Sequence, residues 1–149
     1  MRYLVDTNVI SAGAPSKIGQ GEVADWLDAN SGMLLLSAVT VFEIENGIAR
    51  LRREGATRKA AALTAWFDTL LHLYAHRIFP LDVSIARLAG NLSDRARGNG
   101  FAPGFADVAI AATARHHRLT ILTRNLRDFQ PLGVAACDPF VELPDGPPD

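Results

Sequence analysis

Short apolar runs, each ending abruptly at a polar residue, recur along this chain and alternate with segments of helical spacing. The clearest runs, with the polar residues that end them, are Tyr3–Val5 with Asp6, Met33–Leu36 with Ser37, and Leu119–Leu122 with Thr123. Near-continuous apolar runs of this length are typical of strands buried on both faces, and their alternation with helices favours parallel pairing. The pattern therefore predicts an α/β fold with a central parallel sheet that helices cover on both faces.

Apolar residues at helical spacing indicate where the covering helices lie. Helices are predicted over residues 22–30, from directly after Ser37 to Gly55, and over 57–76, 83–97 and 103–115. Two weaker runs, 77–81 and 134–136, are expected as short strands, and 11–21 is expected as a loop because Gly and Pro recur there. The chain is expected to form one domain over residues 1–140, with a flexible C-terminal tail over 141–149 that is rich in Pro and Gly.

Length, cysteine content and charge limit the class of protein further. A chain of 149 residues with 48% hydrophobic and 21% charged residues can bury a core without a disulfide or a structural metal. The single cysteine, Cys137, excludes an intramolecular disulfide and a cysteine-based zinc site. No apolar run approaches the roughly 18 residues of a membrane span and no export signal is evident, so a cytoplasmic protein is expected. Because the net charge is −1, any attraction to nucleic acid must come from local basic patches.

Carboxylates from distant parts of the sequence lie at or near the ends of the predicted strands. Asp6 follows the first strand, Glu43 comes soon after the second, and Asp107 begins the alanine-rich helix, with Asn125 and Asp128 after the last long apolar run. In parallel sheets, ligands bind beyond the carboxyl ends of the strands. Two carboxylates about 4 Å apart repel by roughly 4 kcal/mol, so a cluster of them needs protons or a cation. All-oxygen ligands favour Mg²⁺ or Mn²⁺, which predicts metal-dependent chemistry on a phosphate.

Each of these acids also has a purely structural explanation. Asp6 is suited to close a turn or cap a helix, and Asp107 lies in a first helical turn, where the helix dipole favours an acid. Glu43 has capping-box spacing from Thr40, and helical geometry alone does not separate Glu43 from Glu45. The apolar surroundings of Asp107 weigh against its structural explanation, because an acid in a buried helix needs a partner.

Four motifs in order make the chain resemble a PIN-domain protein, most closely the VapC-type (FitB-like) toxins of type II toxin–antitoxin systems. The motifs are Val5-Asp6-Thr7-Asn8-Val9-Ile10-Ser11, Ser37-Ala38-Val39-Thr40-Val41-Phe42-Glu43-Ile44, Ala106-Asp107-Val108-Ala109-Ile110-Ala111-Ala112 and Leu122-Thr123-Arg124-Asn125-Leu126-Arg127-Asp128-Phe129. The resemblance covers the chain to about Phe140. It implies a three-layer α/β/α domain around a parallel sheet and a Mg²⁺- or Mn²⁺-dependent endoribonuclease.

The resemblance also implies roles for individual acids. Asp6 and Asp107 would hold the metal ion, and Glu43 would ligate it or orient the attacking water. Asn125 stands where some members carry Asp, and Asp128 is the nearest remaining acid, so either residue is a candidate to complete the site. An Asn offers a carbonyl oxygen but no charge, which leaves the number of bound metals open.

Residues around the acids have implied roles as well. Thr7 and Asn8 would hold the first carboxylate in place, and Thr123 would lie beside the substrate phosphate. The candidates for RNA-backbone contacts are Arg50, Arg52, Arg53, Arg124 and Arg127. A solvated helix face is an equally good explanation of the arginines from residue 50 to 53.

The implied partners are RNA, a second copy of the chain and an antitoxin. Family members usually form homodimers and are silenced by a cognate VapB-type antitoxin whose C-terminal segment lies over the groove. Two other functions are alternatives. A haloacid-dehalogenase-like phosphatase needs a second Asp two residues after the first, where this chain has Asn8, and a catalytically inert PIN module would act only by binding a partner.

Overall fold

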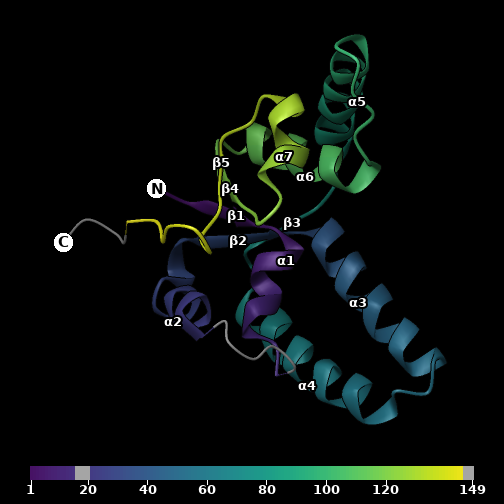
Figure 1. Cartoon of the computed structure of the whole chain (residues 1–149), viewed down its shortest axis with the longest axis vertical. Helices are drawn as coiled ribbons and strands as arrows, with labels where there is room; N and C mark the ends of the chain where they lie inside the picture. Colours follow the sequence, from purple (N-terminus) through teal and green to yellow (C-terminus); the bar gives the residue numbers. More distant parts are fainter. Residues whose placement is uncertain (16–20, 146–149) are drawn as a thin grey trace.

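A five-stranded, all-parallel sheet forms the centre of the molecule, a computed structural model that describes residues 1–15 and 21–145 (Figure 1). The order across the sheet is β3-β2-β1-β4-β5. The strands are β1 (Tyr3–Val5), β2 (Leu34–Ser37), β3 (Ile78–Phe79), β4 (Thr120–Leu122) and β5 (Ala136–Cys137). The chain extends the sheet from β1 to β3 on one side and then crosses to β4 on the other, so the order reverses beside β1, where parallel sheets bind ligands.

Helices cover both faces of the sheet, as the sequence predicts. The α-helices are α1 (Thr7–Ile10), α2 (Gly21–Ala29), α3 (Ala38–Arg53), α4 (Thr57–Leu73), α5 (Val83–Gly98), α6 (Phe105–His116) and α7 (Leu126–Phe129). In Figure 1, α1 to α4 lie on one side of the strands and α5 to α7 on the other, and α3 and α4 pack as a hairpin that projects from the sheet. Within the described residues no helix has both the length and the apolar character needed to cross a membrane.

Two separate hydrophobic cores result from the alternation of side chains along each strand. Leu4, Leu35 and Ile121 join the core beneath α5 and α6, whereas the neighbouring Val5 and Leu122 join the core formed with α1 to α4. Successive residues of a strand point to opposite faces, and all five side chains are buried because helices cover both faces. The predicted three-layer α/β/α fold is therefore confirmed.

The end of α4 differs from the sequence prediction. The helix was expected to reach His76 but ends at Leu73, and the strand expected over 77–81 is limited to Ile78–Phe79. The buried Tyr74 caps the helix, and the guanidinium of Arg77 donates hydrogen bonds to the Ser31 and Leu34 carbonyls. With these contacts the helix ends three residues earlier than helical spacing indicates, and the strand begins one residue later than predicted.

One loop and the last strand also differ from expectation. The predicted loop over 11–21 begins with a 3₁₀ turn at Ser11–Gly13, which buries Ala12, and residues 16–20 of that prediction lie outside the described residues. The last strand lies at Ala136–Cys137, not at 134–136.

The C-terminal segment is held at its beginning. Within the tail predicted over 141–149, Leu143 packs against the core and the Trp26 indole donates a 3.1 Å hydrogen bond to the Pro144 carbonyl. Residues 146–149 of the predicted tail lie outside the described residues.

Candidate active site

Asp6 occupies the carboxyl end of the central strand β1, where the sheet order reverses. Its backbone N–H donates to the Leu122 carbonyl at 2.9 Å and continues the β1–β4 ladder by one residue. The next residues form α1, which Asp6 caps by accepting a 2.9 Å hydrogen bond from the Thr7 N–H at Oδ1. The side chain is only 6% exposed, so the structural explanation of Asp6 as a cap is correct but leaves its second oxygen to be accounted for.

The second oxygen of Asp6 is held by two side chains. Oδ2 accepts a 2.8 Å hydrogen bond from the Thr123 hydroxyl and a 3.3 Å hydrogen bond from the Asn8 amide. Asn8 is itself oriented, because its Oδ1 accepts from the Arg124 N–H at 3.0 Å. Asn8 and the backbone of Thr7 therefore hold the first carboxylate, as the sequence predicts.

Thr123, which is expected beside a substrate phosphate, contacts Asp6. Its side chain is wholly buried, and besides donating to Asp6 its hydroxyl accepts a 3.0 Å hydrogen bond from the Asn125 N–H. The hydroxyl is thus engaged as both donor and acceptor within the protein. Thr123 therefore holds Asp6 in place, and its expected position beside a substrate phosphate stays a prediction.

Glu43 faces Asp6 from α3. Ser37 caps α3 by accepting from the Val39 N–H at 3.1 Å, which rules out the capping-box explanation of Glu43. The Thr7 hydroxyl donates a 2.8 Å hydrogen bond to Glu43 Oε1, so Thr7 links the two acids. Glu45 is exposed, and the structure thus separates two glutamates that helical geometry did not.

Asp107 lies in the first turn of α6 and is half-buried. Its burial, together with the negative charges of Asp6, Asp128 and Glu43, raises its pKa from an ordinary 3.8 to about 6. The pKa of Asp6 is also raised, chiefly by burial and further by the charge of Glu43, although the hydrogen bonds from Thr123, Thr7 and Asn8 act in the opposite direction. The acids from four segments are thus close enough to disfavour one another's charge.

The three predicted acids open onto one cavity of about 380 Å³. Its lining residues are Asp6, Thr7, Asn8, Ser11, Glu43, Asp107, Arg124 and Asn125. Asp128 is exposed and acts on Asp107 by its charge, but it is not part of this lining. Sequence reasoning missed Ser11, whose signal was its place four residues after Thr7, on the same side of a helical turn.

The predicted basic contacts divide into two groups. Arg124 lines the acidic cavity, and Arg127 is exposed nearby on α7. Arg50 forms a 2.9 Å ion pair with Glu54 near the C-terminal end of α3, where Arg52 and Arg53 are also exposed. At 1.5 Å per residue, Arg50 and Arg53 lie about 10 Å and about 15 Å along α3 from Glu43, and neither lines the cavity.

The donor set of the cavity fits a hard divalent cation that is only partly enclosed by protein. All of its candidate ligands are carboxylate, amide or hydroxyl oxygens. Within residues 1–15 and 21–145, no three His, Cys, Asp or Glu side chains are grouped as a ready-made cage for a metal ion. Mg²⁺ is commonly bound by one or two carboxylates with water and substrate phosphates completing its shell. The cavity suits that mode, and its repelling acids would gain from a cation.

The raised pKa of Asp107 predicts a pH-dependent stability in metal-free protein. From about pH 4 to about pH 6 the unfolded chain has released this proton while the folded protein retains it, so the free energy of unfolding falls as the pH rises. The Asp107→Asn side chain stays neutral at every pH, so the variant should melt like the wild type below pH 4 but at a higher temperature above pH 6. Thermal melts in EDTA across this range test it, with Asp94→Asn, an exposed acid on α5, as control. Identical melting of wild type and Asp107→Asn at every pH would contradict the expected repulsion.

A parallel sheet in the order 3-2-1-4-5 is a doubly wound α/β domain, and in this chain acids gather at the carboxyl end of its central strand. The sequence matches the PIN domain family over residues 3–133, and the chain belongs to that family. It is 35% identical to toxin FitB of Neisseria gonorrhoeae over 141 residues, which cover 92% of this chain and 97% of the relative. It is 31% identical to a VapC ribonuclease of Sinorhizobium fredii, with 92% and 96% covered. The crystal structure of FitAcB from Neisseria gonorrhoeae superposes with a TM-score of 0.80 at 35% identity and covers 93% of this chain and 98% of that chain.

Proposed function

We propose that this protein is a Mg²⁺- or Mn²⁺-dependent endoribonuclease that acts as the toxin of a toxin–antitoxin pair. The observation that carries the proposal is the single cavity shared by Asp6, Glu43 and Asp107, two of which have raised pKa values because burial and neighbouring acids disfavour their charge. Such a cluster is stabilised by a bound cation, and the relatives named a toxin and a VapC ribonuclease supply the class of reaction.

The side chains of the cavity would have different roles in hydrolysis. Asp6 and Asp107 would hold the divalent ion, which when bound lowers the pKa of a water and offsets charge on a phosphate. The Asp6 carboxylate is already oriented by hydrogen bonds to both of its oxygens, so it would need little reorganisation to bind the ion. Glu43 accepts a hydrogen bond from Thr7 at Oε1, and among residues 1–15 and 21–145 no group donates to Oε2, which would accept a proton from the attacking water. Asn125 at the cavity wall offers a further neutral oxygen.

Metal binding and metal-dependent cleavage test this function together. Purified protein should cut RNA with Mg²⁺ or Mn²⁺ and stop when EDTA is added. Mn²⁺ at a hundred times its dissociation constant should raise the free energy of unfolding by about 2.7 kcal/mol, and this gain should be lost in Asp6→Asn. Glu45→Gln, which changes an exposed acid two residues from Glu43, is the matched control and should keep the full gain. Cleavage that persists in EDTA would contradict a metal-dependent mechanism.

The same measurements separate the two alternatives. An inert PIN module would bind Mn²⁺ or not, but would cut no RNA in either case. The phosphatase alternative is disfavoured by Asn8, whose amide donates to Asp6 and leaves no second acid at that position. Cleavage of a small phosphate ester without cleavage of RNA would be the result that favours it.

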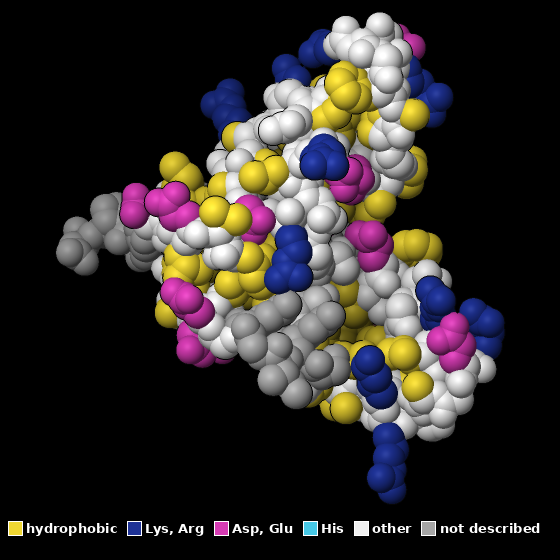
Figure 2. Space-filling view, viewed as in Figure 1, with side chains coloured by type: hydrophobic (Ala, Val, Ile, Leu, Met, Phe, Trp, Pro, Cys, Tyr) yellow, Lys and Arg dark blue, Asp and Glu magenta, His cyan; other side chains and the backbone are white. Residues whose placement is uncertain are grey.

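An antitoxin is the partner that we propose for the apolar surface beside the cavity. A groove of about 580 Å³ between α3 and α6 includes Glu43 and the exposed side chains of Phe42, Leu81 and Phe105. Figure 2 shows the surface hollowed between the two helix layers, with hydrophobic and acidic side chains at the hollow. A toxin requires an inhibitor in the cell that makes it, and a segment lying in this groove would cover Glu43.

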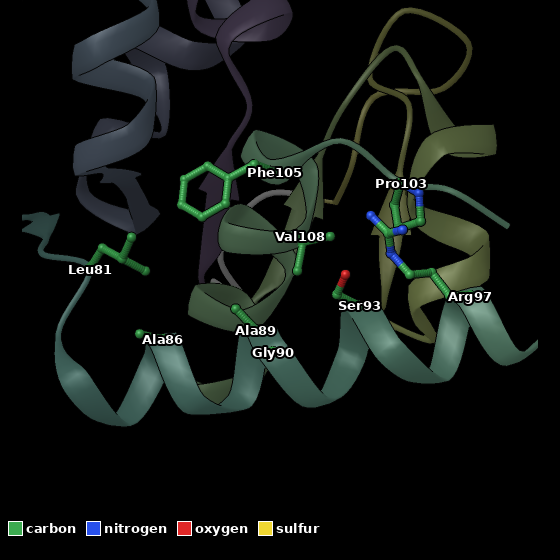
Figure 3. Close-up of a pocket in the computed structure, with 9 residues that line it drawn as sticks. All are labelled: Leu81, Ala86, Ala89, Gly90, Ser93, Arg97, Pro103, Phe105 and Val108. Atoms are coloured by element: carbon green, nitrogen blue, oxygen red, sulfur yellow. The ribbon is translucent and has the colours of Figure 1, made fainter.

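The apolar groove continues along α5. Figure 3 shows Leu81 and Phe105 at one end of a second pocket, of about 370 Å³, with α5 as its floor and Arg97 at its other end. A partner segment therefore has an apolar path that leads away from the cavity toward a basic residue. The expected homodimer stays a prediction.

A further inference from the structure

The guanidinium of Arg124 lines the acidic cavity but is stacked on an aromatic ring. Its central carbon lies 3.8 Å from the centroid of the Phe140 ring, well within the range of a cation–π contact. Although Asp6, Glu43 and Asp107 line the same cavity, the only ion pair among the described residues joins Arg50 to Glu54. The positive charge is thus held beside the acids without neutralising them.

The fold brings Arg124 and Phe140 together from two neighbouring strands. β4 and β5 run parallel with Leu122 opposite Cys137, so the residues just beyond both strands leave the sheet at the same edge. The Arg124 backbone is anchored by its N–H to Asn8 Oδ1 at 3.0 Å. The Phe140 N–H donates to Asp138 Oδ1 at 2.9 Å, and its partly buried ring packs against the core. The ring is therefore a fixed platform, and the flexible partner is the arginine side chain.

Stacking determines which part of the guanidinium is available. The guanidinium carbon lies over the ring, and within residues 1–15 and 21–145 none of the guanidinium N–H groups donates to a protein acceptor. A guanidinium presented in this way matches the paired oxygens of a phosphate. The acids of the cavity remain free for a divalent cation.

We propose that Phe140 is a positioning residue that holds Arg124 at the mouth of the acidic cavity, where its guanidinium binds an RNA phosphate adjacent to the one being cut. This inference rests on the proposed endoribonuclease function and adds one residue to it, because Phe140 itself would touch neither RNA nor the acids. It explains how one site attracts a polyanion although three carboxylates line it. Without the platform, the arginine would be free to turn toward those carboxylates.

Steady-state cleavage of a short RNA in Mg²⁺ tests the proposal through the separation of KM from kcat. Arg124→Ala should raise KM about tenfold, the loss expected for one charged hydrogen-bonded contact, with kcat within about twofold of wild type. Phe140→Leu keeps an apolar side chain but removes the ring, and should raise KM about threefold. Phe140→Tyr should restore the wild-type KM. Matched controls are Arg58→Ala on α4 and Phe101→Leu, both exposed residues outside the cavity lining.

Binding without cleavage supplies an independent readout. RNA affinity measured in EDTA at several salt concentrations should show a slope of log affinity against log salt that is about one unit shallower for Arg124→Ala than for wild type. Phe140→Leu should weaken affinity with melting temperature close to that of the Phe101→Leu control.

The outcomes distinguish this inference from the function on which it rests. If wild type binds RNA with the expected salt dependence but never cuts it, the nuclease proposal fails while Arg124 and Phe140 keep their binding role. If both variants leave KM and the salt slope unchanged, the positioning proposal is overturned even though cleavage is intact. A loss confined to melting temperature, or to binding of an antitoxin, would likewise overturn it, because the stacked pair would then serve packing or a protein partner.

Discussion

The Asp107→Asn variant should cut RNA about a thousandfold more slowly than wild type while remaining fully folded. Asp107 lines the acidic cavity and is a proposed metal ligand, and burial together with the charges of Asp6, Asp128 and Glu43 raises its pKa to about 6. A cation acting on a phosphate contributes several kcal/mol to a reaction barrier, and each 1.36 kcal/mol is a factor of ten in rate. Initial rates on one RNA at saturating Mg²⁺ measure the loss.

Asn is the informative substitution at this position because it keeps the shape of Asp and removes its charge. Metal-free Asp107→Asn is expected to be at least as stable as wild type at neutral pH, so inactivity could not be attributed to unfolding. Asp107→Ala should be equally inactive. Glu45→Gln, which removes an exposed charge from α3, should retain the wild-type rate. A rate for Asp107→Asn within tenfold of wild type would remove Asp107 from the reaction.

The fold and the three acids were predictable because both depend on burial patterns that the sequence displays directly. β1 is three consecutive apolar residues buried on both faces, and the first polar residue after it, Asp6, must leave the sheet at its carboxyl edge. Asp107 was identified because an acid in an apolar helix is costly to bury without a partner, and the structure places it at the cavity. Periodicity and strand order were sufficient for these conclusions.

Features that depend on hydrogen bonds between distant segments were not predictable in the same way. The position of β5 is determined by pairing with β4, through the Ile121 N–H to the Ala135 carbonyl and the Thr123 N–H to the Cys137 carbonyl. A weakly apolar run such as 134–136 does not show in which register it will pair. The inward orientation of Thr123 and the meeting of Arg124 with Phe140 both follow from that register, so they became visible only in the structure.

Thr123→Val should lower kcat by 10- to 100-fold and destabilise the protein by about 2 kcal/mol at neutral pH, with little change in KM. Valine has nearly the same shape, but it removes the 2.8 Å hydrogen bond to Asp6 Oδ2 and leaves that oxygen with the 3.3 Å contact from Asn8. Because the Thr123 hydroxyl lowers the pKa of Asp6, its loss should raise that pKa further and move the acidic limb of the pH–rate profile to higher pH. Steady-state kinetics from pH 5 to pH 8 and chemical denaturation measure the effects.

Two matched variants decide whether Thr123 acts through Asp6. Thr123→Ser keeps the hydroxyl and should retain the wild-type pH profile. Thr113→Val removes another wholly buried hydroxyl, which donates to the Ala109 carbonyl at 2.7 Å within α6, and should cost stability without moving the profile. If Thr123 instead met the substrate phosphate, Thr123→Val would raise KM and leave both the acidic limb and the stability where they were. A shift of the acidic limb on removal of the Thr123 hydroxyl is a result that only a positioning role produces.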